Sequence, residues 1–153
     1  MALIVIFTGC AETQISKEDS ALIVWKTPTF RYADLGFISD SGRELNVEIY
    51  GSGSALMRLK IDQDMICMSR LKCMSKEQFN REVLSHYYPK DIVKNIFRGR
   101  VIFGGRGYTK NTKGFSQNII SKGKYEIEYK VVDKEIIFRD RFNTILIKVK
   151  NMG

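Results

Sequence analysis

Three cysteines and one histidine are the residues whose side chains could support covalent or metal chemistry. Cys67 and Cys73 could close a small loop as a disulfide in an oxidising compartment, or they could stay as two free thiols. Their spacing is not that of a zinc motif, and His86 alone cannot supply the missing ligands, so we expect no metal site and no cofactor. Neither a Ser-His-carboxylate order nor a Cys-His pairing is present, so we expect no enzymatic activity.

The third cysteine, Cys10, ends a short apolar run that begins at Ile4. The run is far shorter than the roughly 20 apolar residues of a transmembrane helix. It resembles the lipobox of a bacterial lipoprotein signal peptide, which implies that residues 1–9 are a signal remnant and that Cys10 is lipidated. Ala11 favours sorting to the outer membrane, so we expect a protein anchored there by lipid on the periplasmic face. The alternative is a buried N-terminal strand with a free thiol.

The residues that follow Cys10 are mostly polar as far as Asp19 and bury too little apolar surface to fold alone. We therefore expect residues 10–20 to form a lipidated tether. Residues 21–153 are enough for one hydrophobic core and too few for two, so they are expected to form a single domain.

The chain is basic, with a formal net charge of +8 and a pI of about 9.4. Clustered cations are typical of nucleic-acid binding. Here the Lys and Arg residues are spread along the whole chain, and the expected location is the cell envelope, so we expect no nucleic-acid partner. The same charge would favour anionic lipid headgroups or acidic partner surfaces.

Apolar and polar residues alternate in four segments, which is the pattern of half-buried strands. Short turn sequences separate many of the predicted strands, such as the one at residues 40–42. Closely spaced strands joined by short turns predict an antiparallel sheet. The four alternating segments are residues 45–49, 55–61, 125–131 and 145–149.

Two helices interrupt this pattern in the middle of the chain. Ser75 and Gln78 form a capping box at the start of the first, which is predicted to run from about Lys76 to Leu84. The second begins near Pro89, places apolar residues on one face, and ends at Gly99. Strands, then helices, then strands predict a sheet with helices packed against one side.

Several segments resemble LolB, the outer-membrane lipoprotein receptor. Tyr88–Gly99 resembles the family's helix that contains a proline, a hydrophobic pair, an aromatic residue and a final glycine. Gly114–Gln117 resembles the segment before its late hairpin. Tyr125–Tyr129 resembles a strand that leads into a tyrosine, and Thr144–Val149 resembles the terminal strand.

The resemblance implies a mainly β (α+β) fold, with an open antiparallel half-barrel sheet and helices covering its concave face. An apolar hollow under the helices would accept acylated lipoproteins from a LolA-like periplasmic carrier and help insert them into outer-membrane lipid, without covalent chemistry. Ten apolar residues are predicted to line this hollow, or else to belong to an ordinary core. They are Val47, Ile49, Met57, Leu59, Ile92, Ile96, Phe97, Phe115, Ile127 and Tyr129.

One loop departs from the family pattern. LolB carries an exposed leucine on a loop that touches the membrane, and the matching loop here is Gly51, Ser52 and Gly53, with Ser52 at the leucine position. This membrane-contact loop therefore has little apolar area to insert. The rival interpretation is a structural or accessory envelope lipoprotein that docks onto an outer-membrane machine. It predicts a filled core and an exposed apolar patch.

Overall fold

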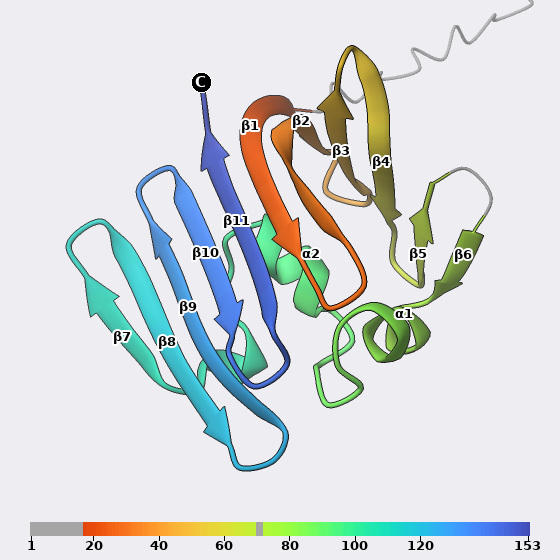
Figure 1. Cartoon of the computed structure of the whole chain (residues 1–153). Coiled ribbons are helices and arrows are strands. Elements are labelled where there is room, and N and C mark those ends of the chain that lie inside the picture. The colour runs from red at the N-terminus through yellow and green to blue at the C-terminus, as the bar shows by residue number, and fades with distance from the viewer. Residues whose placement is uncertain (1–16, 70–71) are drawn as a thin grey trace, which may run out of the picture.

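The structure, a computed structural model, describes residues 17–69 and 72–153. Within these residues eleven strands form one open antiparallel sheet, and two α-helices and one 3-10 helix lie between the sixth and seventh strands (Figure 1). The predicted mainly β fold with an open antiparallel sheet is confirmed. The strands are β1 Lys17–Lys26, β2 Arg31–Asp40, β3 Leu45–Gly51, β4 Ser54–Ile61, β5 Met65–Met68, β6 Lys72–Ser75, β7 Tyr108–Asn111, β8 Gly114–Ser121, β9 Tyr125–Val132, β10 Glu135–Asp140 and β11 Ile145–Asn151.

The sheet consists of two meanders joined at its centre. Strands β1 to β6 follow one another in space, as do β7 to β11, and β1 pairs with β11 between them. Helices α1 (Lys76–Val83) and α2 (Ile92–Phe97) therefore lie on a connection between the two opposite edge strands, β6 and β7. This connection has to cross the width of the sheet, and it places the helices over one face (Figure 1).

The face under the helices is apolar, and this face forms the single hydrophobic core of the described residues. On β1, the buried residues Ala21, Ile23 and Trp25 alternate with more exposed ones. The same alternation repeats on the neighbouring strands, so one face of each strand is removed from water. We call this apolar side the inner face and the opposite side the outer face.

Neighbouring strands approach each other closely at Gly36. This residue is buried in β2 and pairs with Ile49 of β3. A Cβ atom added to it would lie 2.1 Å from the carbonyl oxygen of Glu48 and 2.9 Å from Cδ1 of Ile23. Only glycine fits at this point without a backbone shift, and Figure 1 shows the strong bend of β1 and β2 in this part of the sheet.

Both helices lie close to where their sequence signals place them. The Oγ atom of Ser75 accepts a hydrogen bond from the Gln78 amide at 3.1 Å, as the capping box predicts, and α1 ends one residue before the predicted Leu84. Helix α2 begins at Ile92, later than the predicted start near Pro89, because residues before it form a turn. Gly99 follows α2 with φ of +64°, the left-handed conformation that glycine adopts most readily.

The predicted tether is too long at its C-terminal end. Lys17–Ser20 were assigned to it, but they lie in β1 and pair with Asp40–Phe37 of β2. Their polar sequence does not indicate a strand, and hydrogen bonding to β2 is what stabilises this end of β1. Residues 1–9, Cys10 and the rest of the predicted tether up to residue 16 lie outside the described residues.

Candidate lipid-binding site

The ten residues predicted to line an apolar hollow all lie on the inner face or on α2. Nine of them are buried in the hydrophobic core. The tenth, Phe115 on β8, is half-buried, and its ring centroid lies 5.8 Å from that of Tyr129. The structure thus gathers residues from both meanders and from α2 into one apolar layer between the sheet and the helices.

Trp25 stands at the centre of this layer and was not among the predicted residues. Its ring centroid lies 5.6 Å from that of Phe97 on α2 and 6.3 Å from that of Phe79 on α1. Trp25 is fully buried, and its indole Nε1 has no hydrogen-bond partner among the described residues. The alternation of Ala21, Ile23 and Trp25 is the sequence signal that could have identified this strand.

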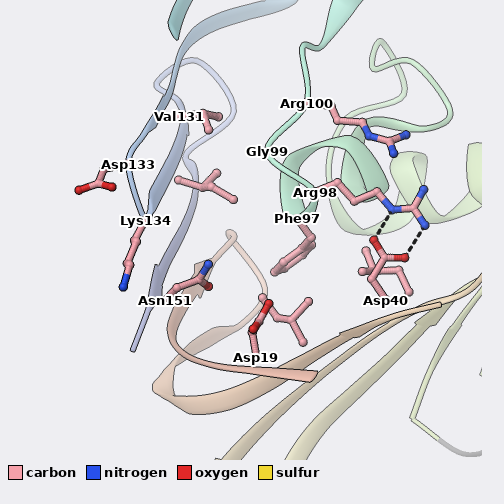
Figure 2. A pocket seen from close by; sticks show the side chains of 13 residues that line it. Asp19, Asp40, Phe97, Arg98, Gly99, Arg100, Val131, Asp133, Lys134 and Asn151 are labelled. Atoms are coloured by element: carbon pink, nitrogen blue, oxygen red, sulfur yellow. Dashed lines mark hydrogen bonds and ion pairs between the residues drawn. The ribbon is translucent and has the colours of Figure 1, made fainter. Parts of the chain in front are cut away.

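A hollow of about 340 Å³ lies next to the core at the C-terminal end of α2 (Figure 2). Phe97 borders it, so one aromatic ring contacts both the hollow and Trp25. Apolar side chains from β2, β3, β9 and β10 form part of its wall, and charged side chains form the rest. The apolar residues are Ile38, Leu45, Phe97, Val131 and Ile136, and the charged ones are Asp19, Asp40, Arg98, Arg100, Asp133 and Lys134.

An ion pair between Arg98 and Asp40 closes one side of this hollow. Arg98 Nε donates to Asp40 Oδ2 at 2.9 Å, and Arg98 Nη2 donates to Asp40 Oδ1 at 2.7 Å (Figure 2). Arg98 Nη2 also donates to the Gly42 carbonyl at 3.0 Å, and only 7% of the Arg98 side chain is exposed. The hydrogen bonds from Arg98 lower the pKa of the Asp40 carboxyl. This pair ties the end of α2 to the end of β2.

Two more polar contacts hold the helical connection in place. The buried Lys76 ammonium at the start of α1 contacts Asp91, just before α2, with Nζ and Oδ1 2.7 Å apart, and this bond lowers the pKa of Asp91. The Tyr88 hydroxyl donates to the fully buried carboxylate of Asp140 at the end of β10. Burial and the Asp140 carboxylate raise the pKa of Tyr88. Polar contacts therefore hold the segment that precedes α2 at Tyr88 and at Asp91.

The predicted membrane-contact loop is the tip of the β3–β4 hairpin. Ser52 and Gly53 are exposed there and have φ values of 52° and 80°, as in a tight two-residue turn. The tip carries no apolar side chain. The nearest large one is Leu56 on β4, which is 50% exposed and lies against Gly51, beside a bulge in the β3–β4 register.

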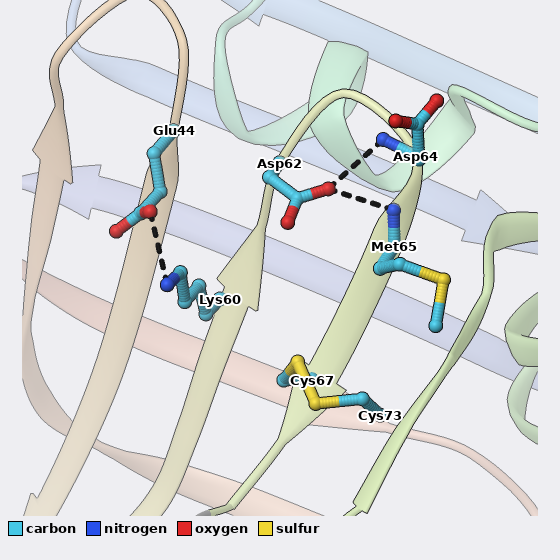
Figure 3. Close-up of a disulfide and its surroundings, with 7 residues drawn as sticks. All are labelled: Glu44, Lys60, Asp62, Asp64, Met65, Cys67 and Cys73. Carbon is cyan, nitrogen blue, oxygen red and sulfur yellow. Dashed lines mark hydrogen bonds and ion pairs between the residues drawn. A yellow bond between two sulfur atoms is a disulfide. The ribbon is translucent and has the colours of Figure 1, made fainter.

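Cys67 and Cys73 face each other directly on β5 and β6, and they form a disulfide (Figure 3). The sequence left this pairing open, because it does not show that the two cysteines lie in register on neighbouring strands. The turn that joins β4 to β5 is held by the Asp62 carboxylate, which accepts hydrogen bonds from the amides of Asp64 and Met65 at 2.9 and 2.8 Å. The disulfide fastens the edge of the sheet from which the helical connection departs.

The remaining candidate groups have surface positions. His86 is exposed, and its ring lies on that of Tyr87. Glu126 and Glu128 both form ion pairs with Arg141. The described residues include no group of His, Cys, Asp and Glu that could hold a metal ion, and none of their helices is long and apolar enough to cross a membrane.

The fold and the site together define a class of architecture: an open antiparallel half-barrel whose apolar inner face is closed by a helical connection. Compared with models of known families and with curated proteins, the chain matches none.

Proposed function

We propose that this protein is a LolB-like lipid-anchored receptor of the outer membrane. It accepts acylated lipoproteins from a LolA-like periplasmic carrier and helps insert them into the membrane, without covalent chemistry. The observation that carries the proposal is the apolar layer between the sheet and α2, which continues through Phe97 into a hollow at the surface. Cys10, at the N-terminal side of β1, supplies the anchor in this proposal.

The driving force is the removal of acyl chains from water, which is worth about 25 cal/mol per Å² of apolar area. The hollow of about 340 Å³ lies at the lower end of the size range of ligand pockets, roughly 300–1,000 Å³. Acceptance of several acyl chains therefore requires α2 to move away from the sheet. Such a movement breaks the Arg98–Asp40 pair and exposes the buried face of α2, including Ile96 and Phe97.

The unpaired indole N–H of Trp25 fits an acylated ligand. A buried donor without a partner costs about 1–3 kcal/mol, and Trp25 lies in contact with the ring that borders the hollow. Ester and amide carbonyls of an acylated cysteine are acceptors that enter together with the chains. Trp25→Phe keeps an aromatic ring and removes the N–H, so it should weaken binding of an acyl probe about fivefold.

The decisive experiment is cargo transfer in solution. The full chain with Cys10→Ser, which prevents lipidation, is mixed with a carrier-bound lipoprotein, and the cargo on each protein is quantified. Phe97→Glu should abolish transfer, and the milder Phe97→Leu should reduce it in a protein whose melting curve shows that it is folded. Failure of the folded wild-type chain to take cargo would refute the proposal.

The docking-module interpretation remains the second candidate, because the inner face is a closed apolar layer and the outer face exposes apolar side chains. The outer face of β1 and β2 exposes Leu22, Leu35 and Phe37, and Leu22 lies directly opposite Leu35. Leu35→Glu is therefore the matched variant for the transfer assay. A receptor should transfer cargo normally with Leu35→Glu, whereas a docking module should show no transfer and lose its envelope partner with this change.

A further inference from the structure

A second hollow lies on the outer face, at the end of the sheet formed by the β1–β2 and β10–β11 turns. Its volume is about 270 Å³, and four cationic side chains line it together with Leu146. Leu146 is less buried than its neighbours Ile145 and Ile147, which belong to the core. Ile145 also lines the hollow, which shares no lining residue with the hollow that Phe97 borders. The cations are Lys26, Arg31, Arg139 and Arg141.

The strand register places three of these cations in one row across the sheet. Lys26 on β1 lies directly opposite Arg31 on β2 and, on its other side, opposite Leu146 of β11. Leu146 in turn lies opposite Arg139 of β10. Directly opposite residues share a face, and like charges opposite each other destabilise a sheet. The Lys26–Arg31 pair therefore costs stability in the protein alone, whereas Arg139 lies directly opposite Glu128 of β9.

No carboxylate among the described residues forms an ion pair with Lys26, Arg31 or Arg139. One carboxylate, Asp140, does line the hollow, but it is fully buried and already accepts hydrogen bonds from the Tyr88 hydroxyl and from backbone amides of the β10–β11 turn. Lys26 and Arg31 are thus left for an anion from outside the described residues, while Arg139 has the Glu128 carboxylate directly opposite it on β9.

An exposed aromatic side chain lies in the β10–β11 turn, which contributes Arg141 and Thr144 to the hollow. Phe142 is 56% exposed in the β10–β11 turn, next to Arg141, which Glu126 and Glu128 already pair. Cations with no carboxylate partner next to an exposed aromatic ring are typical of surfaces that rest on a bilayer, where the cations meet phosphates and the ring enters the headgroup layer.

We propose that this end of the outer face binds the surface of a bilayer that contains anionic phospholipid. A lipid phosphate occupies the hollow among Lys26, Arg31 and Arg139, and Phe142 inserts between neighbouring headgroups. The proposal does not depend on acyl-chain transfer, because it uses the opposite face of the sheet.

The test is co-sedimentation of the full chain with Cys10→Ser, so that no attached acyl chain contributes to binding. Vesicles of phosphatidylcholine are compared with vesicles that also contain phosphatidylglycerol. We expect binding only to the anionic vesicles and weaker binding at higher salt. Each basic residue near such a surface contributes roughly fivefold to the affinity, so the triple variant K26Q/R31Q/R139Q should bind about 100-fold more weakly.

The matched control is K90Q/K110Q/K113Q, which removes the same charge from exposed positions remote from the hollow. It should stay within about threefold of the wild type if the site, and not the net charge, determines binding. Phe142→Ser should weaken binding about fivefold without changing the melting temperature, because the ring is largely exposed.

Two results would overturn the proposal. One is equal loss of binding in the triple variant and its control, which would mean that the net charge alone attracts the vesicles. The other is stabilisation of the protein by inorganic phosphate through the same three cations with no vesicle binding, which would identify a site for a free anion. Transfer of cargo in solution is measured separately, so neither result bears on the acyl site.

Discussion

The inner and outer faces of the sheet are made of the same strands but differ in how completely their side chains are paired. The inner face is a closed apolar layer, and the helical connection over it is fastened by Arg98–Asp40, Lys76–Asp91 and Tyr88–Asp140. Among the described residues, the outer face leaves Lys26 and Arg31 without a carboxylate partner and several apolar side chains exposed. Stability therefore resides on the inner face, and the outer face has side chains available for a surface contact.

The largest effect should come from comparing two residues of β1 that point to opposite faces. Trp25→Ala should lower the free energy of unfolding by about 3–5 kcal/mol, because it empties the centre of the core. Leu22→Ala, three residues earlier and 41% exposed, should lower it by less than about 1 kcal/mol. Urea unfolding measures both. Similar losses for the two variants would mean that the outer face is also covered in the folded protein.

A second comparison separates a buried hydroxyl from an exposed one in neighbouring residues. Tyr88→Phe should cost about 1–2 kcal/mol, since the buried Asp140 carboxylate loses the hydroxyl that donates to it. Tyr87→Phe is the control, because Tyr87 is exposed and its hydroxyl has no hydrogen bond within the described residues. Unfolding curves for both variants give the difference, and an equal cost would remove Tyr88 from the set of contacts that close the inner face.

The Arg98–Asp40 pair predicts a pH dependence. The pKa of Asp40 is lowered in the folded protein, so its contribution is fully present above the unfolded pKa of about 3.9 and is lost as the pH falls through the lower folded value. Asp40→Asn should cost about 1 kcal/mol at neutral pH. Its difference from the wild type should disappear in acid when urea unfolding is repeated along a pH series. A constant difference at all pH values would contradict this assignment.

The Asp40→Asn variant also tests the receptor proposal. If opening of α2 limits acyl-chain uptake, Asp40→Asn should accelerate cargo acceptance while it lowers stability, because the ion pair is broken in the open state. Lys60→Gln is a suitable control, since its ion pair with Glu44 joins β4 to the turn before β3 and includes no residue of α2. If both variants accelerate cargo acceptance, the cause would be the lower overall stability of the protein and not the loss of the Arg98–Asp40 pair.

The sequence predicted well those elements whose own residues determine them. The alternation in β3, β4, β9 and β11 and the Ser75 cap required no knowledge of distant partners. The start of β1 was missed because Lys17–Ser20 are polar and become a strand only through pairing with β2. The disulfide was left open for the same reason, since the register of β5 and β6 is a tertiary property.

The candidate sites show the same limit more clearly. Nine of the ten predicted apolar residues are buried, six of them predicted from strand alternation and three from the apolar face of α2. Neither pattern can indicate that Phe97 alone among the ten borders the hollow. Arg98 and Asp40 are far apart in sequence, and nothing local predicts their contact. The cationic row on the outer face likewise depends on pairing between β1 and β11, the two ends of the described chain.

The smallest expected effect tests the outer face directly. Arg31→Glu replaces a like-charge pair across β1 and β2 by an opposite-charge pair with Lys26, so it should raise the free energy of unfolding by about 0.5 kcal/mol. Arg31→Gln removes only the repulsion and should give a smaller gain, and both gains should shrink at high salt. The Arg31→Glu variant should at the same time bind anionic vesicles less well than Arg31→Gln. If replacing Arg31 stabilises the protein but weakens membrane binding, the residue serves the contact with the membrane. Destabilisation by Arg31→Glu would instead mean that the positive charge of the row is neutralised within the protein itself.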